Sequence, residues 1–137
     1  MKIPEDIYYR VLDLATALVR ASEGFDREEH STLYNELREV VDGEVASGNP
    51  HPFLFETLAD FTDDDPTALD LYQRGLDYAD RPDAAAYRAS ILLSMAERHR
   101  TMGNASMARE CAGRAEEAAK LVDDPELRKQ ISEFLLE

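Results

Sequence analysis

Apolar residues return every three or four positions along most of this chain, which is the spacing of one face of an α-helix. The clearest stretch is 87–122, where two helical segments are joined at Met102, Gly103 and Asn104. Small residues occur there at positions where two helices must approach closely. The large and small positions of this hairpin are Met95, Ala96, Gly103, Ala108, Ala112 and Ala115. With no strand pattern elsewhere, the sequence predicts an all-α protein made of antiparallel helical hairpins.

Prolines and acidic residues mark the helix starts. Proline has no backbone N–H and suits the first helical position, and aspartate accepts a hydrogen bond from the free N–H groups of the first turn. Pro4, Pro66 and Pro125 each combine such a proline with neighbouring acidic residues. We therefore expect about seven helices in one domain, 1–137, with hairpins at about 4–46, 51–80 and 84–121 and a final helix at about 125–136.

Three acidic positions predict helix caps. Asp26 and Glu29 have the spacing of a capping box, in which each side chain bonds a backbone N–H near the other residue. The run 63–65 stands where a helix start favours negative charge. Asp83 is the expected cap of the fifth helix.

The apolar positions also predict which faces are buried. The helix at about 52–62 is apolar over much of its circumference, so we expect neighbours on several of its sides. The first helix is expected to bury a single stripe, which consists of Tyr8, Val11, Leu12, Ala15, Leu18 and Val19.

The charge balance restricts the partners. The chain has 29 acidic and 15 basic residues, which gives a net charge of −14. Nucleic acids and anionic membrane surfaces are bound through Lys and Arg, so both are disfavoured here. A basic protein or peptide is favoured, because opposite charge accelerates encounter. The same acidity also keeps a protein dissolved, and this plainer explanation stays open.

The single cysteine, Cys111, excludes an internal disulfide and fits a reducing compartment. The first residues lack the pattern of a secretion leader, and no apolar run approaches the ~20 residues of a membrane span. We therefore expect a cytoplasmic protein. Cys111 lies on the small-residue stripe, where we expect a buried and unreactive thiol.

Enzymatic and metal-binding chemistry finds little support in the sequence. His30, His51 and His99 fall on different predicted helices or their ends, and no His-Glu-x-x-His or paired Cys-x-x-Cys spacing is present. The acidic run 63–65 lacks the alternating spacing of a calcium loop. We expect no catalytic residue, no cofactor and no metal.

An internal comparison suggests a repeat. Aligning Ala68 with Ala108, 40 residues apart, places Gly75 opposite Ala115 and Arg74 on Arg114. The order of large and small residues resembles a tetratricopeptide repeat, a pair of antiparallel helices that recurs about every 34 residues. The match is best over 92–115, extends through 51–79, and covers the first pair only as a helical hairpin. The resemblance implies a short right-handed solenoid.

In that family the first helix of each pair lines a concave groove that binds a peptide or protein segment. Carried over to this chain, the resemblance implies a partner-binding groove, which Tyr8 and Thr16 would extend. Phe53 could instead belong to the core, and Glu56, Asp60 and Glu97 could form a solvated face. The implied groove residues are Tyr9, Phe53, Glu56, Asp60, Ser90, Leu93, Glu97, Arg100 and Thr101.

Three functions of different class follow. The favoured one is an adaptor that binds a basic or mixed peptide in an acidic groove. The alternative is an immunity or antitoxin protein, or a secretion chaperone, that neutralises or holds a basic effector. An enzyme or metal protein is the least supported. We expect a monomer whose last helix covers the end of the fold, with a homodimer through that helix as the alternative.

Overall fold

A computed structural model describes all 137 residues, and the chain is all-helical with no strand. Seven α-helices confirm the expected class, and a short 3-10 helix, η1, precedes α5. None of the helices combines the length and apolarity needed to cross a bilayer. The helices are α1 (Glu5–Glu23), α2 (Arg27–Ala46), α3 (Pro52–Asp60), α4 (Asp65–Tyr78), η1 (Pro82–Ala84), α5 (Ala85–Thr101), α6 (Ala105–Ala119) and α7 (Pro125–Leu136).

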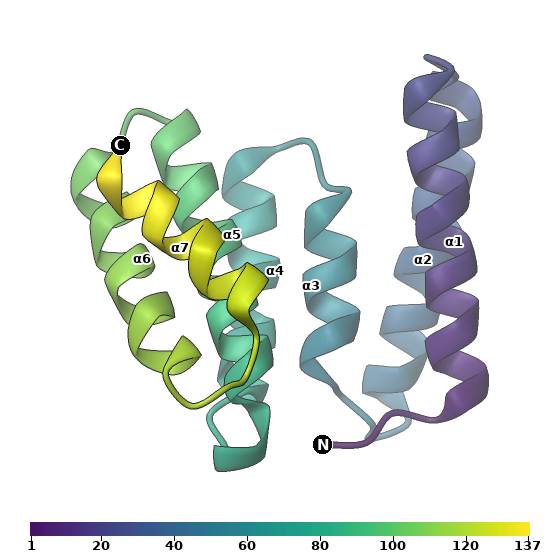
Figure 1. The fold of residues 1–137 in the computed structure, drawn as a ribbon. Coiled ribbons are helices and arrows are strands. Elements are labelled where there is room, and N and C mark those ends of the chain that lie inside the picture. The colour runs from purple at the N-terminus through teal and green to yellow at the C-terminus, as the bar shows by residue number, and fades with distance from the viewer.

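Consecutive helices pack side by side in chain order (Figure 1). α1 packs on α2, α3 on α4 and α5 on α6, while α7 lies against α6 and α5 at one end of the row. The first helices of the three pairs also touch in turn, since α1 contacts α3 and α3 contacts α5. Side chains from α1, α3 and α5 can therefore share one face of the molecule.

Two hydrophobic clusters form the core. The smaller joins α1, α2 and α3 through residues such as Leu18, Leu37 and Phe55. The larger runs from α3 to α7, where Ile131 of α7 is buried. α3 contributes buried residues to both clusters, Ala59 being its member of the larger one. This agrees with the apolar circumference of the 52–62 segment.

Small residues let the later helices pack closely, because the short side chain of an alanine or glycine leaves room for two helix backbones to approach each other. Ala112, Ala115 and Cys111 of α6 are buried as the sequence predicts. Burial raises the pKa of the Cys111 thiol. Gly75 of α4 is equally confined, since an added Cβ would lie 3.1 Å from Cβ of Phe55.

The predicted stripe of α1 is partly wrong. The buried residues are Val11, Leu14, Leu18 and Ala21, whereas Val19 is 45% exposed. Tyr8, Leu12 and Ala15 are only half-buried. α1 is the first element and packs only on α2 and one edge of α3, so its apolar surface is wider than the area its neighbours cover.

Two of the three cap predictions hold. Asp26 accepts a hydrogen bond from the backbone N–H of Glu29, and Asp64 accepts one from Thr67. The reciprocal bond of the capping box, from the Asp26 N–H to the Glu29 carboxylate, is absent, because the Asp26 N–H donates to the carbonyl of Ala21. The third prediction is wrong, since α5 starts without a side-chain cap.

Asp83 has a different role from the predicted one. It lies in η1 and accepts hydrogen bonds from the Arg81 guanidinium at 3.0 Å and from the Met1 ammonium at 2.9 Å. Two cations near its carboxylate outweigh the free N–H groups of the next turn. Asp83 therefore joins the start of the chain to the segment between α4 and α5.

Paired glycine substitutions test the close packing of α3, α4 and α5. In Gly75→Ala, the new methyl would lie 3.1 Å from Cβ of Phe55 and 3.2 Å from Cδ1 of Ile91, so we expect the free energy of unfolding to fall by about 1–3 kcal/mol. In the control Gly113→Ala, no atom lies within 4 Å of the new methyl, and helix propensity should raise stability by up to about 1 kcal/mol. Urea unfolding measures both. Equal effects would contradict the packing at Gly75.

Candidate functional site: the face shared by α1, α3 and α5

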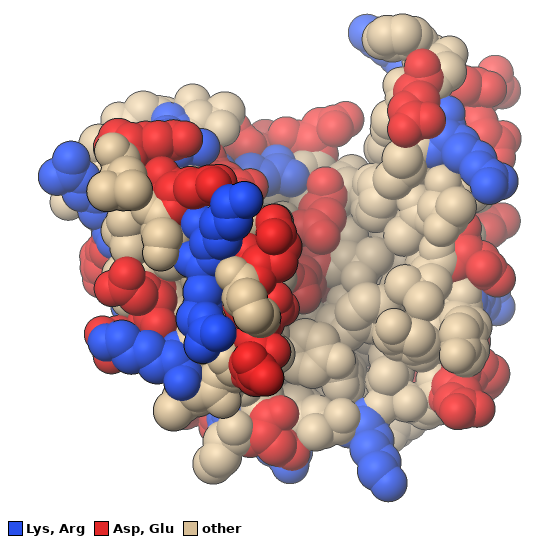
Figure 2. All heavy atoms as spheres, viewed as in Figure 1, with Lys and Arg blue, Asp and Glu red and all other residues tan.

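One side of the molecule is hollowed (Figure 2). The hollow lies between α1 and the part of the molecule formed by α5 to α7, viewed as in Figure 1. Acidic side chains gather along the α5 to α7 side, and the wall over α1 is mostly uncharged. We call this surface the concave face.

Aromatic residues form the uncharged part of this face. The Tyr8 ring of α1 lies 5.1 Å from the Phe53 ring of α3, centroid to centroid, and 5.4 Å from the Tyr9 ring. Tyr9 is 60% exposed. Leu12 follows Tyr8 by one helical turn and is half-buried, so it extends the same stripe. The α1 residues that the core leaves uncovered therefore supply an apolar wall.

Glu56 is the most perturbed acid of the face. It is a half-buried residue of α3, and Oγ of Ser90 on α5 donates a hydrogen bond to its Oε2 at 2.5 Å. Burial raises its pKa to about 7, the Ser90 hydrogen bond opposes that rise, and the nearby charge of Asp60 adds to it. No Lys or Arg forms an ion pair with Glu56.

Asp60 lies one turn further along α3. The residue is exposed as a whole, but its carboxylate accepts a hydrogen bond from the buried Tyr72 hydroxyl at 2.5 Å. Burial of the carboxylate raises its pKa, while the Tyr72 bond and the Arg98 charge lower it. Arg98 itself pairs with Asp65 at 3.0 Å. Burial likewise raises the pKa of Glu97 on α5.

The structure brings together most, but not all, of the residues implied by the sequence. Ser90 donates to Glu56, Phe53 precedes Glu56 by one helical turn on α3, and the charge of Glu97 contributes to the raised pKa of Asp60. Leu93 is different, because it is 5% exposed and belongs to the larger core cluster.

The last two residues of the set lie at the far end of α5. Arg100 forms an ion pair with Glu137, and its guanidinium lies 4.1 Å from the Phe134 ring centroid. The Thr101 hydroxyl donates to the carbonyl of Glu97. The C-terminal helix thus already engages Arg100.

Two further residues of this region are not among the groove residues that the resemblance implies. Tyr87 fits the helical spacing of the α5 core, yet it is half-buried, and burial together with the charges of Glu56 and Tyr8 raises its pKa. His51 stands directly before α3 and is buried. It caps α3 through Nδ1, which accepts from Phe53 N–H, but its buried Nε2 has no partner. Because Tyr87 follows the helical spacing of the buried residues of α5, the sequence does not show that part of its side chain is exposed.

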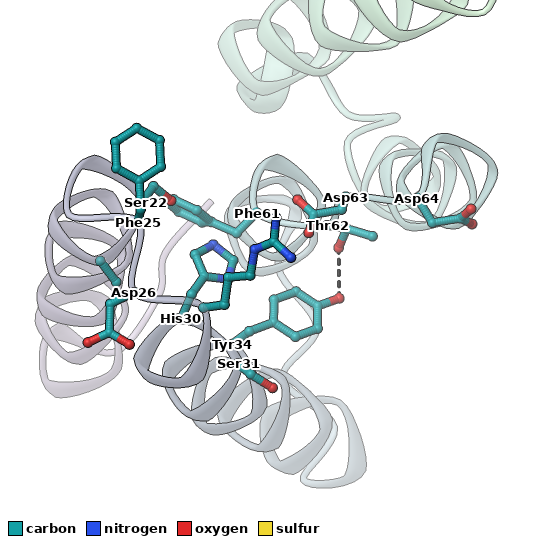
Figure 3. A pocket seen from close by; sticks show the side chains of 12 residues that line it. Ser22, Phe25, Asp26, His30, Ser31, Tyr34, Phe61, Thr62, Asp63 and Asp64 are labelled. Carbon is teal, nitrogen blue, oxygen red and sulfur yellow. Dashed lines mark hydrogen bonds between the residues drawn. The ribbon is translucent and has the colours of Figure 1, made fainter.

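A separate pocket of about 670 Å³ lies beyond the end of α3 (Figure 3). α1 and α2 have 19 and 20 residues and α3 has nine, so the first hairpin extends about 15 Å past α3 at 1.5 Å per residue. His30 and Tyr34 of α2 face Phe61 across the gap, and the Tyr34 hydroxyl lies 2.7 Å from Oγ1 of Thr62. No residue of the sequence-predicted groove lines this pocket.

Phe25, at the rim of this pocket, has a strained backbone. Its φ of 55° places a bulky residue in the left-handed region, in a turn closed by the bonds from Asp26 N–H to Ala21 and from Phe25 N–H to Ser22. Glycine normally takes this position, but Gly24 stands one residue too early, with φ −84°. Phe25 is 91% exposed, so burial of its side chain does not offset the strain.

Comparisons with known proteins leave the site to be interpreted from its own geometry. No protein-family model, curated protein or solved structure matches the chain. Within the structure, no group of three or more His, Cys, Asp or Glu side chains is arranged to hold a metal ion.

The strain at Phe25 predicts an unusual stabilising substitution. Phe25→Gly should raise the free energy of unfolding by about 1 kcal/mol, because a left-handed bulky residue costs roughly 1–2 kcal/mol and the added freedom of the unfolded glycine offsets part of the gain. In the control Gly24→Ala the backbone angle is ordinary, and we expect a change within about 0.5 kcal/mol. Urea unfolding decides, and a less stable Phe25→Gly variant would contradict the strain.

The raised pKa values predict that stability falls between mildly acidic and neutral pH. Glu56 has a pKa of about 7 in the folded protein against an ordinary value of 4.5, so the folded state binds more protons between these limits. The free energy of unfolding should therefore decrease from pH 5 to pH 8, by roughly 1–3 kcal/mol. The raised pKa values of Asp60 and Glu97 act in the same direction.

Urea unfolding at several pH values tests this dependence. Glu56→Gln should be more stable than the original chain at pH 8 and should flatten the curve, because the amide is neutral and still accepts the Ser90 bond. Glu39→Gln, at an exposed position of α2, is the matched control. A stability that rises from pH 5 to pH 8 would refute the buried-carboxylate account.

Proposed function

We propose that this protein is a tetratricopeptide-like interaction module whose concave face binds a basic polypeptide segment that also carries apolar side chains. The observation that carries the proposal is the position of Glu56. It is a half-buried acid with no cationic partner, on a face that α1 lines with aromatic rings. A buried charge without a partner is costly, and a bound cation would remove that cost.

The helix arrangement supports this assignment. α1, α3 and α5 are the first members of three successive pairs and contact one another in turn, which is the relation that a right-handed helical-repeat solenoid requires. Gly75 of α4 is buried against α3 and α5, and Ala112 and Ala115 of α6 are buried where α6 packs on its neighbours.

The last helix supports a monomer. Ile131 is buried, and Leu127, Phe134 and Leu135 pack against the larger core cluster. Most of the apolar stripe of α7 is therefore used within the chain, which is the behaviour of a terminal capping helix. Leu136, at 87% exposed, is what remains for another protein.

Charge and apolar area would have separate effects on binding. The net charge of −14 accelerates encounter with a basic partner. This acceleration is larger at low ionic strength, because salt screens the attraction. Tyr9, Leu12 and Phe53 provide area that a partner's apolar side chains can cover, at about 25 cal/mol per Å². A segment with both kinds of side chain matches the face better than a purely basic one.

A second candidate is a protein that neutralises or holds a folded basic effector, such as an immunity protein, an antitoxin or a secretion chaperone. It is favoured by the wide distribution of acidic side chains, which occur at several places on the visible surface outside the hollow as well (Figure 2). A folded basic partner could contact these carboxylates as well as the concave face.

Selection from a displayed library of random 12-residue peptides tests the proposed function. We expect enriched peptides with net positive charge and at least one large apolar residue. The triple variant Glu56→Gln, Asp60→Asn and Glu97→Gln should bind the enriched peptides about tenfold more weakly, with a flatter dependence on salt. Enrichment without positive charge would contradict the proposal.

A matched triple on α2 separates the two candidates. Glu28, Glu36 and Glu39 are exposed, and their change to Gln alters net charge by the same amount. If a peptide segment binds the concave face, this control keeps its affinity within about twofold. If both triples weaken the binding of a basic partner equally, the neutralising function is supported instead.

A further inference from the structure

We propose that Glu56, with Tyr8, Phe53, Tyr87 and Ser90, forms a socket for one cationic side chain of the bound segment, an arginine or a lysine. This inference rests on the proposed function, because it names the residues of the concave face that contact a positive charge of the partner. We call these five residues the Glu56 socket.

Three helices build the socket. Tyr8 comes from α1, Phe53 and Glu56 from α3, and Tyr87 and Ser90 from α5. Phe53 precedes Glu56 by three residues and therefore shares its side of α3. The Tyr8 and Phe53 rings lie 5.1 Å apart, and Tyr87 is close enough to both Tyr8 and Glu56 for their charges to act on its hydroxyl.

One carboxylate oxygen of Glu56 receives no hydrogen bond from within the chain. The Ser90 hydroxyl occupies Oε2, and no group of the chain donates to Oε1. Oε1 is not fully enclosed by the protein. A carboxylate that is half-buried, lacks a cation and keeps one open oxygen is suited to receive a charged N–H group.

No Lys or Arg of the chain pairs with Glu56, and the arginines of α5 have other partners. Arg88 donates to the carbonyls of Ala79 and Arg81. Arg98 is turned to Asp65 and to the carbonyl of Ala59, and Arg100 is held by Glu137 and the Phe134 ring. The required cation therefore comes from the partner.

Aromatic rings favour a cation at this position and acidic neighbours exclude an anion. Rings attract a cation over their faces, typically within about 6 Å of the centroid. The chain uses this contact elsewhere, with the Arg74 guanidinium 4.7 Å from the Phe55 centroid. An anion would meet Asp60, whose charge already acts on Glu56. A neutral group would leave the Glu56 charge uncompensated.

Occupation of the socket is coupled to a proton. A cation binds the ionised form of Glu56, whose pKa is about 7 in the free protein. Binding therefore lowers this pKa and releases a proton near neutral pH, and affinity should fall about tenfold from pH 8 to pH 6. The other titratable groups that face Glu56 are Asp60 on α3 and Tyr87 on α5, with Tyr8 of α1 beside Tyr87.

NMR titration of the full chain tests the socket with three probes: Nα-acetyl-argininamide, Nα-acetyl-lysinamide and the uncharged isostere Nα-acetyl-citrullinamide. We expect both cationic probes to shift the signals of Phe53, Glu56, Tyr87 and Ser90, and the citrulline probe to leave them unchanged. The Glu56 carboxyl carbon should report a pKa that falls from about 7 toward 4.5 as a cationic probe saturates the site. The stronger of the two cationic probes identifies the preferred side chain.

Two variants complete the test. Glu56→Gln should weaken the cationic probes at least fivefold and remove the dependence on pH, whereas Glu39→Gln, at an exposed acid of α2, should change affinity by less than twofold. Equal binding of the citrulline probe, or equal loss in both variants, would overturn the socket.

The socket can fail while the proposed function stands. Enriched basic peptides that bind the original chain and Glu56→Gln equally would overturn the socket and leave the concave face as the binding surface. A library without basic enrichment, together with no response to either cationic probe, would overturn both.

Discussion

The packing of one short helix determines most of this structure. α3 has nine residues, and it is held on two sides, with Leu54, Phe55 and Leu58 in the smaller core and Ala59 in the larger. Gly75 of α4 permits this approach, because no side chain stands between it and Phe55. With so many apolar neighbours, only a narrow strip of α3 remains for polar groups.

That narrow strip explains the electrostatics of the concave face. Glu56 and Asp60 lie one turn apart on it, and each is partly removed from water by the same helices that bury the rest of α3. One serine hydroxyl and one tyrosine hydroxyl stabilise them, where an ion pair would be the stronger compensation. Proteins commonly retain such a stability cost where a site must interact with something else.

The sequence predicts what depends on local chemistry. Seven helices, the caps Asp26 and Asp64 and the buried small residues of α6 follow from spacing, side-chain hydrogen bonding and size. The same reasoning fails where a distant group competes. Asp83 pairs with Arg81 and the Met1 ammonium in preference to capping α5, and no periodic pattern shows that the Met1 ammonium would be near.

The candidate site is predictable in outline only. Helical spacing places Phe53 and Glu56 on one side of α3, and the repeat resemblance adds Ser90, but it also adds Leu93, which the core takes. The burial of Glu56 cannot be read from the sequence, because it depends on how closely α5 approaches α3. Phe25 is missed for a related reason, since Gly24 one residue earlier is the expected place for a left-handed backbone.

Cys111 makes it possible to measure how often one end of this molecule opens. The residue is 1% exposed and lies among the alanines of α6, and burial raises the pKa of its thiol and so keeps it in the unreactive protonated form. A disulfide reagent can modify it only after α5, α6 and α7 separate, so the modification rate reports how often that end of the molecule opens. With a single thiol in the chain, the signal has one source and requires no added label.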